Sequence, residues 1–186
     1  MHVLTLVGDR FSGKTALCEL WSGHPATNAY LMTIHITPYQ FSQLIIYDTP
    51  SMERFLEDVE EWYAVSDVII LMASIDQYTD SWYLRISKRY PELEWILILN
   101  GDNQFQLRRL WALENDIRVF QLNTCSGKNV HETLANITDY LEDIPMRLTK
   151  EGYFWNYWPV EAFYSIYTRI ISSIFGNSSS GAMGSK

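Results

Sequence analysis

The sequence predicts a doubly wound α/β domain, with a mostly parallel sheet of six strands and helices on both of its faces. Two observations carry this prediction. Residues 67–72 (DVIILM) and 95–99 (WILIL) are short, nearly continuous apolar runs, typical of strands buried on both faces of a parallel sheet. Segments of helical period separate these runs from further apolar stretches, and such alternation favours an α/β arrangement. Ligands of such sheets bind beyond the carboxyl ends of the strands.

The hydrophobic pattern assigns the other elements in chain order. Residues 3–7 predict a first strand, and the apolar side of residues 15–21 predicts a helix directly after it. Two further strands are expected at 30–36 and 43–47, as a hairpin pair across Pro38. Helices at 80–90 and 105–113 flank the apolar run 95–99, a last strand follows at 117–122, and a last helix carries Val130, Leu134, Ile137 and Leu141 at helical spacing.

Composition narrows the class of protein. The 186 residues suffice for one domain with a core, and seven Trp and twelve Tyr indicate a packed chain rather than a disordered one. A formal net charge of −8 argues against nucleic acid as a partner, because such binding depends on cations that neutralise phosphates. Cys18 and Cys125 are expected to be reduced thiols, and neither they nor the four histidines show zinc-ligand spacing.

The two ends of the chain bear on its location. The start lacks the basic region and cleavage site of a signal peptide, and no stretch reaches the length of a membrane-spanning helix, so we expect a cytoplasmic protein. Residues 177–186 (NSSSGAMGSK) resemble a linker left by cloning. We therefore expect the native C-terminus, with any lipidation cysteine, to be missing.

Three divisions of the chain are expected: the α/β unit at 1–142, a connector with an aromatic amphipathic helix at 143–176, and the linker at 177–186. Pro159 suits the first turn of that helix, and apolar residues recur at helical spacing after it. Three interpretations of the helix stay open. It packs on the domain, it fills a groove on a partner or another copy, or it lies on a membrane surface.

A phosphate-binding loop is the strongest motif. Residues 8–15 (GDRFSGKT) match G-x-x-x-x-G-K-[ST] between a predicted strand and a predicted helix. In such loops, backbone N–H groups and the helix N-terminus favour the anion; Lys14 would reach the β and γ phosphates, and Thr15 would bind Mg²⁺. The alternative is an inherited loop that no longer binds. The predicted nucleotide contacts here are Gly8, Arg10, Phe11, Ser12, Gly13, Lys14, Thr15 and Ala16.

Residues 48–55 (DTPSMERF) resemble the D-T-A-G-Q-E-R-F segment of Ras-like GTPases of the Rab branch. The phosphate loop is similar to that family's G-D-x-x-x-G-K-[ST], and Asn129-Val130 to its N-V pair. The resemblance spans roughly residues 1–142. It implies a small G-protein domain that binds GTP or GDP with Mg²⁺, recruits effectors in membrane traffic and sits peripherally on an intracellular membrane. The implied metal ligands are Thr15, Asp48 and Thr27, with Thr33 and Thr37 open as alternatives to Thr27.

The chain departs from the family where hydrolysis is promoted. Ser51 replaces the Gly whose N–H contacts the γ-phosphate, and Pro50 before it restricts the backbone. Met52 replaces the Gln that positions water, and a thioether is only a weak acceptor. Bulky Arg10 and Phe11 would crowd an incoming arginine finger. We therefore expect no catalytic residue and very slow hydrolysis.

The base-reading segments are altered as well. Residues 100–103 (NGDN) replace the family's N-K-x-D, so that Asn103 stands where a carboxylate accepts two guanine hydrogen bonds. Residues 123–125 (NTC) correspond to the family's S-A-K, which leaves open a backbone contact to guanine O6. Weakened guanine specificity follows. The predicted nucleotide contacts in these segments and at the third strand are Ser51, Asn100, Asn103, Thr124 and Cys125.

Two functional hypotheses result. The first is a divergent GTPase that binds nucleotide and turns over slowly. The second is a pseudo-GTPase scaffold that keeps the fold for protein contacts. Another P-loop enzyme, such as a small kinase, is least favoured. Protein partners are expected at the C-terminal aromatic helix or at an acidic helix that carries Glu53, Glu57, Asp58, Glu60 and Glu61. Contact with a membrane would be indirect or through the missing C-terminus.

Overall fold

A computed structural model describes residues 1–26, 33–41, 43–51, 59–76 and 81–144. These residues belong to one compact unit, Met1–Arg147; a second unit, Leu148–Lys186, lies outside them. The predicted C-terminal helix and linker therefore stay predictions. No helix in the described ranges is long and apolar enough to cross a bilayer.

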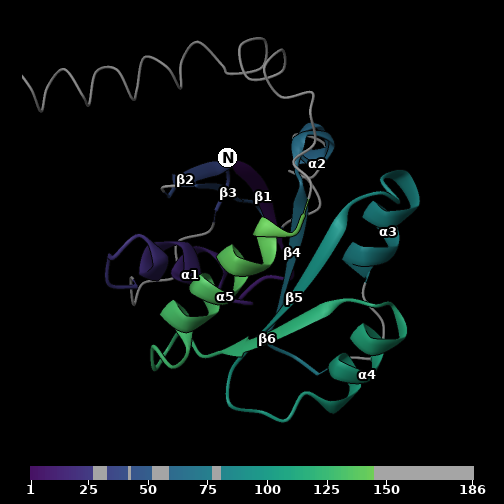
Figure 1. The fold of residues 1–186 in the computed structure, drawn as a ribbon. Helices are drawn as coiled ribbons and strands as arrows, with labels where there is room; N and C mark the ends of the chain where they lie inside the picture. The colour runs from purple at the N-terminus through teal and green to yellow at the C-terminus, as the bar shows by residue number, and fades with distance from the viewer. Residues whose placement is uncertain (27–32, 42, 52–58, 77–80, 145–186) are drawn as a thin grey trace, which may run out of the picture. The chain divides into compact units, whose positions relative to one another are not determined.

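Six strands form one sheet in the order β2-β3-β1-β4-β5-β6 (Figure 1). Their bounds are β1 His2–Val7, β2 Thr37–Gln40, β3 Leu44–Asp48, β4 Val68–Ala73, β5 Glu94–Asn100 and β6 Arg118–Leu122. Every pairing is parallel except that of β2 with β3, so the predicted mostly parallel sheet is confirmed. Chain order reverses around β1, which pairs with β3 on one side and β4 on the other, and ligands of open α/β sheets bind at such a point.

Helices cover both faces of the sheet, as predicted. Leu17, Cys18 and Trp21 of α1 (Lys14–Trp21) share a buried cluster with Ile137 and Leu141 of α5 (Val130–Glu142). The Trp21 indole also donates to Val130 O at 2.8 Å, which joins these two helices. The opposite face packs against α2 (Glu60–Val65), α3 (Ser81–Arg89) and α4 (Gln106–Glu114), which contribute Tyr63, Trp82, Ile86 and Trp111 to a second cluster. Figure 1 shows α1 and α5 on one side of the sheet and α3 and α4 on the other.

The strand predicted at 30–36 is wrong in its described part. Residues 33–36 are not in a strand, and the edge strand is Thr37–Gln40, with Pro38 inside it and paired with Tyr47. Proline lacks an N–H, which normally excludes it from a sheet interior. β2 is an edge strand with a neighbour on only one side, which is where a sheet accommodates proline.

A matched pair of leucines tests the assignment of core and surface. Leu97 in β5 is 0% exposed, whereas Leu113 near the end of α4 is 78% exposed. We expect Leu97→Ala to lower the free energy of unfolding by about 2–5 kcal/mol, because it leaves a cavity in the cluster between the sheet and the helices α2, α3 and α4. Leu113→Ala should change it by no more than about 0.5 kcal/mol. Urea unfolding of both variants measures this, and equal effects would contradict the fold.

Candidate nucleotide-binding site

The phosphate loop follows β1 and opens α1, and its path requires two glycines. Gly8 has φ +143° and Gly13 φ +94°, conformations that residues with a Cβ rarely adopt. A Cβ on Gly8 would lie 2.2 Å from Met72 O, and one on Gly13 would lie 2.4 Å from Asn100 Nδ2. The loop therefore packs directly against the carboxyl ends of β4 and β5, where neither site tolerates a side chain.

Lys14 turns its ammonium back into this loop. Nζ donates to Gly8 O at 2.8 Å and to Asp9 O at 3.1 Å, and lies 3.5 Å from Ser12 Oγ. The side chain is buried, and loss of solvation lowers the pKa of Lys14 to about 8, although the charges of Asp48 and Asp9 oppose this shift. Because desolvation outweighs the attraction of these two carboxylates, a bound anion would further stabilise the ammonium, which the predicted role of Lys14 requires.

Hydroxyl and carboxylate oxygens meet beside Lys14. Thr15 Oγ1 donates to Asp48 Oδ2 at 2.6 Å, and Thr33 Oγ1 lies 2.9 Å from Thr15 Oγ1 and 3.4 Å from Asp48 Oδ2. Asp48 Oδ1 is buried and has no hydrogen-bond partner among the described residues. Burial raises the pKa of Asp48, while the hydrogen bond from Thr15 and the charge of Lys14 oppose the shift. We call Thr15, Thr33 and Asp48 the oxygen cluster.

The oxygen cluster fits Mg²⁺ by its chemistry. Magnesium prefers hard oxygen ligands and is usually held by one or two carboxylates together with substrate phosphates. In the described part of the chain, no group of three or more His, Cys, Asp or Glu side chains gathers to hold a metal by itself. Phosphate oxygens and water would therefore complete the coordination. Thr33, which the sequence left as an alternative, lies in the cluster, whereas Thr27 lies outside the described residues.

Asn100 joins the phosphate loop to the segment after β6. Its Nδ2 donates to Ser12 O at 2.9 Å and to Thr124 Oγ1 at 3.0 Å, and its Oδ1 accepts from the Thr124 N–H at 2.9 Å. Three elements thus depend on one amide: the loop after β1, the end of β5 and the start of the loop after β6. The sequence assigned Asn100 to the base, and the structure adds this linking role.

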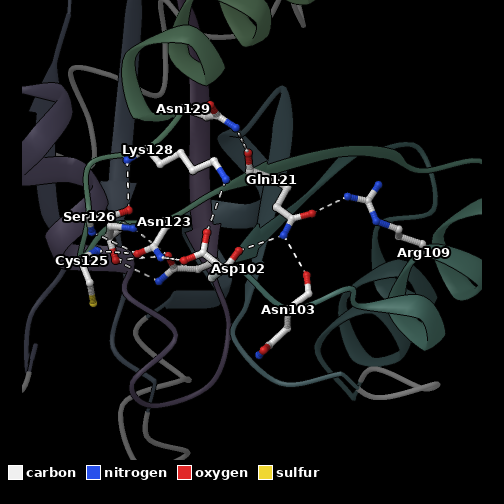
Figure 2. A network of polar contacts seen from close by, with 12 residues as sticks. Asp102, Asn103, Arg109, Gln121, Asn123, Cys125, Ser126, Lys128 and Asn129 are labelled. Atoms are coloured by element: carbon white, nitrogen blue, oxygen red, sulfur yellow. Dashed lines mark hydrogen bonds and ion pairs between the residues drawn. The ribbon is translucent and has the colours of Figure 1, made fainter.

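A second polar network holds the segments predicted to read the base (Figure 2). Asn123 Nδ2 donates to Asp102 Oδ2 at 2.7 Å, and Lys128 Nζ lies 3.7 Å from Asp102 Oδ1. The N–H groups of Cys125 and Ser126 both donate to Asn123 Oδ1, at 2.9 and 3.2 Å. Gln121 Nε2 donates to the backbone carbonyls of Gly101 and Asn103, each at 2.9 Å. Figure 2 shows the Asn103 amide turned away from this network.

The other predicted contacts lie around the loop. Phe11 adopts φ +64°, and the residue is 65% exposed, so it does not fill the interior of the loop. The Arg10 guanidinium stands 4.9 Å from the centre of that ring, as a cation–π pair at the surface. Ala16 is half-buried in the first turn of α1, and half-buried Ser51 follows Pro50 after β3. Met52 lies outside the described residues.

Two features of the site had no clear signal in the sequence. The Trp82 indole donates to Asp9 Oδ1 at 2.9 Å, a contact between residues 73 positions apart that no local pattern marks. The role of Asn123 depends on how the loop after β6 folds back, with Asn123 N–H donating to Lys128 O at 3.0 Å. In the sequence, Asn123 was marked only by its position directly after a predicted strand, where it corresponds to the first residue of the family's S-A-K.

Comparison with known proteins supports the fold. No protein-family model and no curated protein matches the chain. Among solved structures, a bacterial selenocysteine-specific elongation factor, EF-Sec, is similar with a TM-score of 0.64 and 18% identity, covering 78% of this chain and 30% of that one. The elongation factor SelB from Methanococcus maripaludis, in complex with the GTP analogue GppNHp, is similar with a TM-score of 0.60 and 12% identity, covering 78% and 35%.

This likeness shows that the chain has the fold of a P-loop GTPase domain, as the sequence predicted. The chain spans about a third of each neighbour's length. Both neighbours are translation factors, so the finer resemblance to the Rab branch, carried by residues 48–55, is not supported by them and stays a prediction.

The pKa of Lys14 predicts how triphosphate affinity depends on pH. In the nucleotide-free protein, Lys14 loses its proton near pH 8 instead of its ordinary 10.5. A bound anion favours the ammonium, so binding above pH 8 must take up a proton. We expect the Kd for Mg-GppNHp to be constant between about pH 6.5 and 7.5 and to rise about tenfold by pH 9. Titration calorimetry at each pH measures this, and a Kd that does not change up to pH 9 would contradict it.

The same lowered pKa of Lys14 makes the stability of the nucleotide-free protein rise with pH, whereas it makes the triphosphate affinity fall. The unfolded chain keeps the Lys14 proton up to 10.5, whereas the folded protein releases it near 8. The unfolded state therefore binds more protons in this window, and the contribution of Lys14 to stability rises with pH between the two values. Lys14→Ala should remove that part of the pH dependence in thermal unfolding.

Proposed function

We propose that this protein is a Mg²⁺-dependent nucleoside-triphosphate-binding module of the GTPase type, with impaired hydrolysis and weakened guanine preference, which recruits protein partners. The observation that carries the proposal is the buried ammonium of Lys14 beside the oxygen cluster. One group favours phosphate oxygens and the other favours a hard cation, so the pair is suited to a metal-bound triphosphate.

Geometry around the loop supports a bound anion. Lys14 lies in the first turn of α1, whose N-terminal N–H groups add positive partial charge at the same place. Phe11 is mostly exposed to solvent. Gly8 and Gly13 have no side chain that would keep a phosphate away from the backbone of the loop. The solved structure of SelB, which has a similar fold, holds a GTP analogue.

A pseudo-GTPase is the second candidate, and one observation favours it. The Lys14 ammonium already has acceptors inside its own loop, at Gly8 O and Asp9 O, which reduces its need for a ligand. In that case the fold would serve protein contacts alone, through the acidic segment around α2 or the aromatic segment near the C-terminus. A role in membrane traffic rests only on the resemblance of residues 48–55 to the Rab branch.

A matched pair of lysine variants tests triphosphate binding. We expect excess Mg-GTP to raise the melting temperature of the wild-type protein by on the order of 5 °C, since a ligand at 100 times its Kd adds about 2.7 kcal/mol. Lys14→Ala should abolish this shift because it removes the cation that meets the phosphates. Lys88→Ala, at an exposed residue in the last turn of α3, should retain it.

Chelation of magnesium with EDTA should reduce the shift in the wild-type protein, because the oxygen cluster then lacks its cation. If Mg-GTP leaves the melting temperature of the wild-type protein unchanged, the pseudo-GTPase is the better account. An equal shift in wild type and Lys14→Ala would mean that nucleotide binds elsewhere.

The residue at position 52 tests impaired hydrolysis. Met52→Gln restores the amide that positions the attacking water in the family this segment resembles. We expect single-turnover GTP hydrolysis to rise about tenfold or more over the wild-type rate, with little change in the Kd for GppNHp. Met52→Leu, which has no amide, is the control. No gain in Met52→Gln would show that Met52 is not what limits hydrolysis.

A further inference from the structure

Both polar atoms of the Asn123 side chain are hydrogen-bonded at the carboxyl edge of the sheet. It directly follows β6, and its Oδ1 accepts from the N–H groups of Cys125 and Ser126, while its Nδ2 donates to Asp102 (Figure 2). The side chain therefore holds its own loop and ties that loop to the segment after β5.

The consequence concerns three successive backbone donors. The Thr124 N–H donates to Asn100 Oδ1 at 2.9 Å, and the next two N–H groups donate to Asn123 Oδ1. If the segment 123–125 meets the base as the family resemblance implies, these are the backbone groups that would hydrogen-bond a carbonyl at the 6-position of a purine. A guanine O6 would have to displace an amide oxygen already in place, and exchanging one acceptor for another gains little.

The residue expected to accept hydrogen bonds from the N–H groups of guanine also disfavours guanine recognition. Asn103 offers an amide where two guanine N–H groups would need a carboxylate, and its side chain is turned away from the network (Figure 2). The neighbouring carboxylate of Asp102 accepts from Asn123 Nδ2 at 2.7 Å and pairs with Lys128 at 3.7 Å. Asp102 would have to leave these contacts in order to replace the carboxylate that position 103 lacks.

We propose that Asn123 is a specificity-determining residue that makes the site indifferent to the purine base, so that it takes adenine and guanine nucleoside triphosphates with similar affinity. The proposal rests on the triphosphate binding proposed above. Affinity then comes from the phosphate loop and the oxygen cluster, which meet only the part that ATP and GTP share. Removing the Asn123 amide frees two donors and creates a preference for a 6-oxo purine.

Calorimetric titration of the full chain with Mg-bound ATP, GTP and inosine triphosphate at pH 7 tests this. Inosine triphosphate keeps the 6-oxo group of GTP and lacks its 2-amino group. In the wild-type protein we expect the three Kd values to agree within about threefold. In Asn123→Ala we expect GTP and inosine triphosphate to bind about tenfold more tightly than ATP, the gain of about one net hydrogen bond.

Asn115→Ala is the matched control. The Asn115 side chain donates to Trp111 O at 2.8 Å at the end of α4, so it belongs to neither loop, and its removal should leave the three affinities level. Thermal unfolding of each variant verifies its fold. The wild-type affinities need no variant and test the proposal even if Asn123→Ala fails to fold.

The outcomes distinguish failure of the role of Asn123 from failure of triphosphate binding. Tight wild-type binding of GTP with at least thirtyfold weaker binding of ATP would overturn the role of Asn123 and leave triphosphate binding intact. Equal affinities for the three nucleotides in a folded Asn123→Ala would also overturn that role. Failure of the wild-type protein to bind any of the three would overturn both proposals together.

Discussion

A cation enclosed by its own backbone is the constraint around which the site is organised. Moving the Lys14 ammonium out of water is unfavourable, and the cost is offset by the carbonyls of Gly8 and Asp9 and by the nearby charge of Asp48. The loop that carries those carbonyls packs closely against β4 and β5 at Gly8 and Gly13, whose backbone angles disfavour a side chain. The loop, the charge and the glycines therefore depend on one another.

The parts of the site on the two sides of this loop differ in which hydrogen-bonding groups they leave open to a ligand. Toward β3, Thr15, Thr33 and Asp48 supply hard oxygens, and one carboxylate oxygen is left for a further partner. Toward β5 and β6, the Asn123 amide accepts from and donates to groups of the segments that we propose lie beside the base. The half of the site proposed to meet phosphate and metal therefore keeps a buried cation and hard oxygens, while the half proposed to meet the base is hydrogen-bonded internally. Asn100 connects the two halves through Ser12 and Thr124.

How much of this was predictable differs by element. The apolar runs of β4 and β5 were located to within a residue or two, because strands buried on both faces leave no polar positions. The phosphate loop was predicted residue by residue, since its chemistry fixes residue types and spacing. β2 was misplaced, because an edge strand needs neither continuous hydrophobicity nor an N–H at every position, and Pro38 looked like a turn. Thr33 was only one of three candidate metal-binding threonines, and Asn123 was noted only within the segment that corresponds to S-A-K, because their roles depend on contacts 15 and 21 residues away that no local pattern encodes.

Phosphorus-31 NMR of one equivalent of Mg-GppNHp with the wild-type protein tests the central claim most directly, because it observes the phosphates themselves. If the Lys14 loop and the oxygen cluster hold a metal-bound triphosphate, the β and γ resonances will shift and broaden in the wild-type protein and keep their free positions with Lys14→Ala. Free resonance positions in the presence of the folded wild-type protein, at concentrations well above micromolar, would contradict the account.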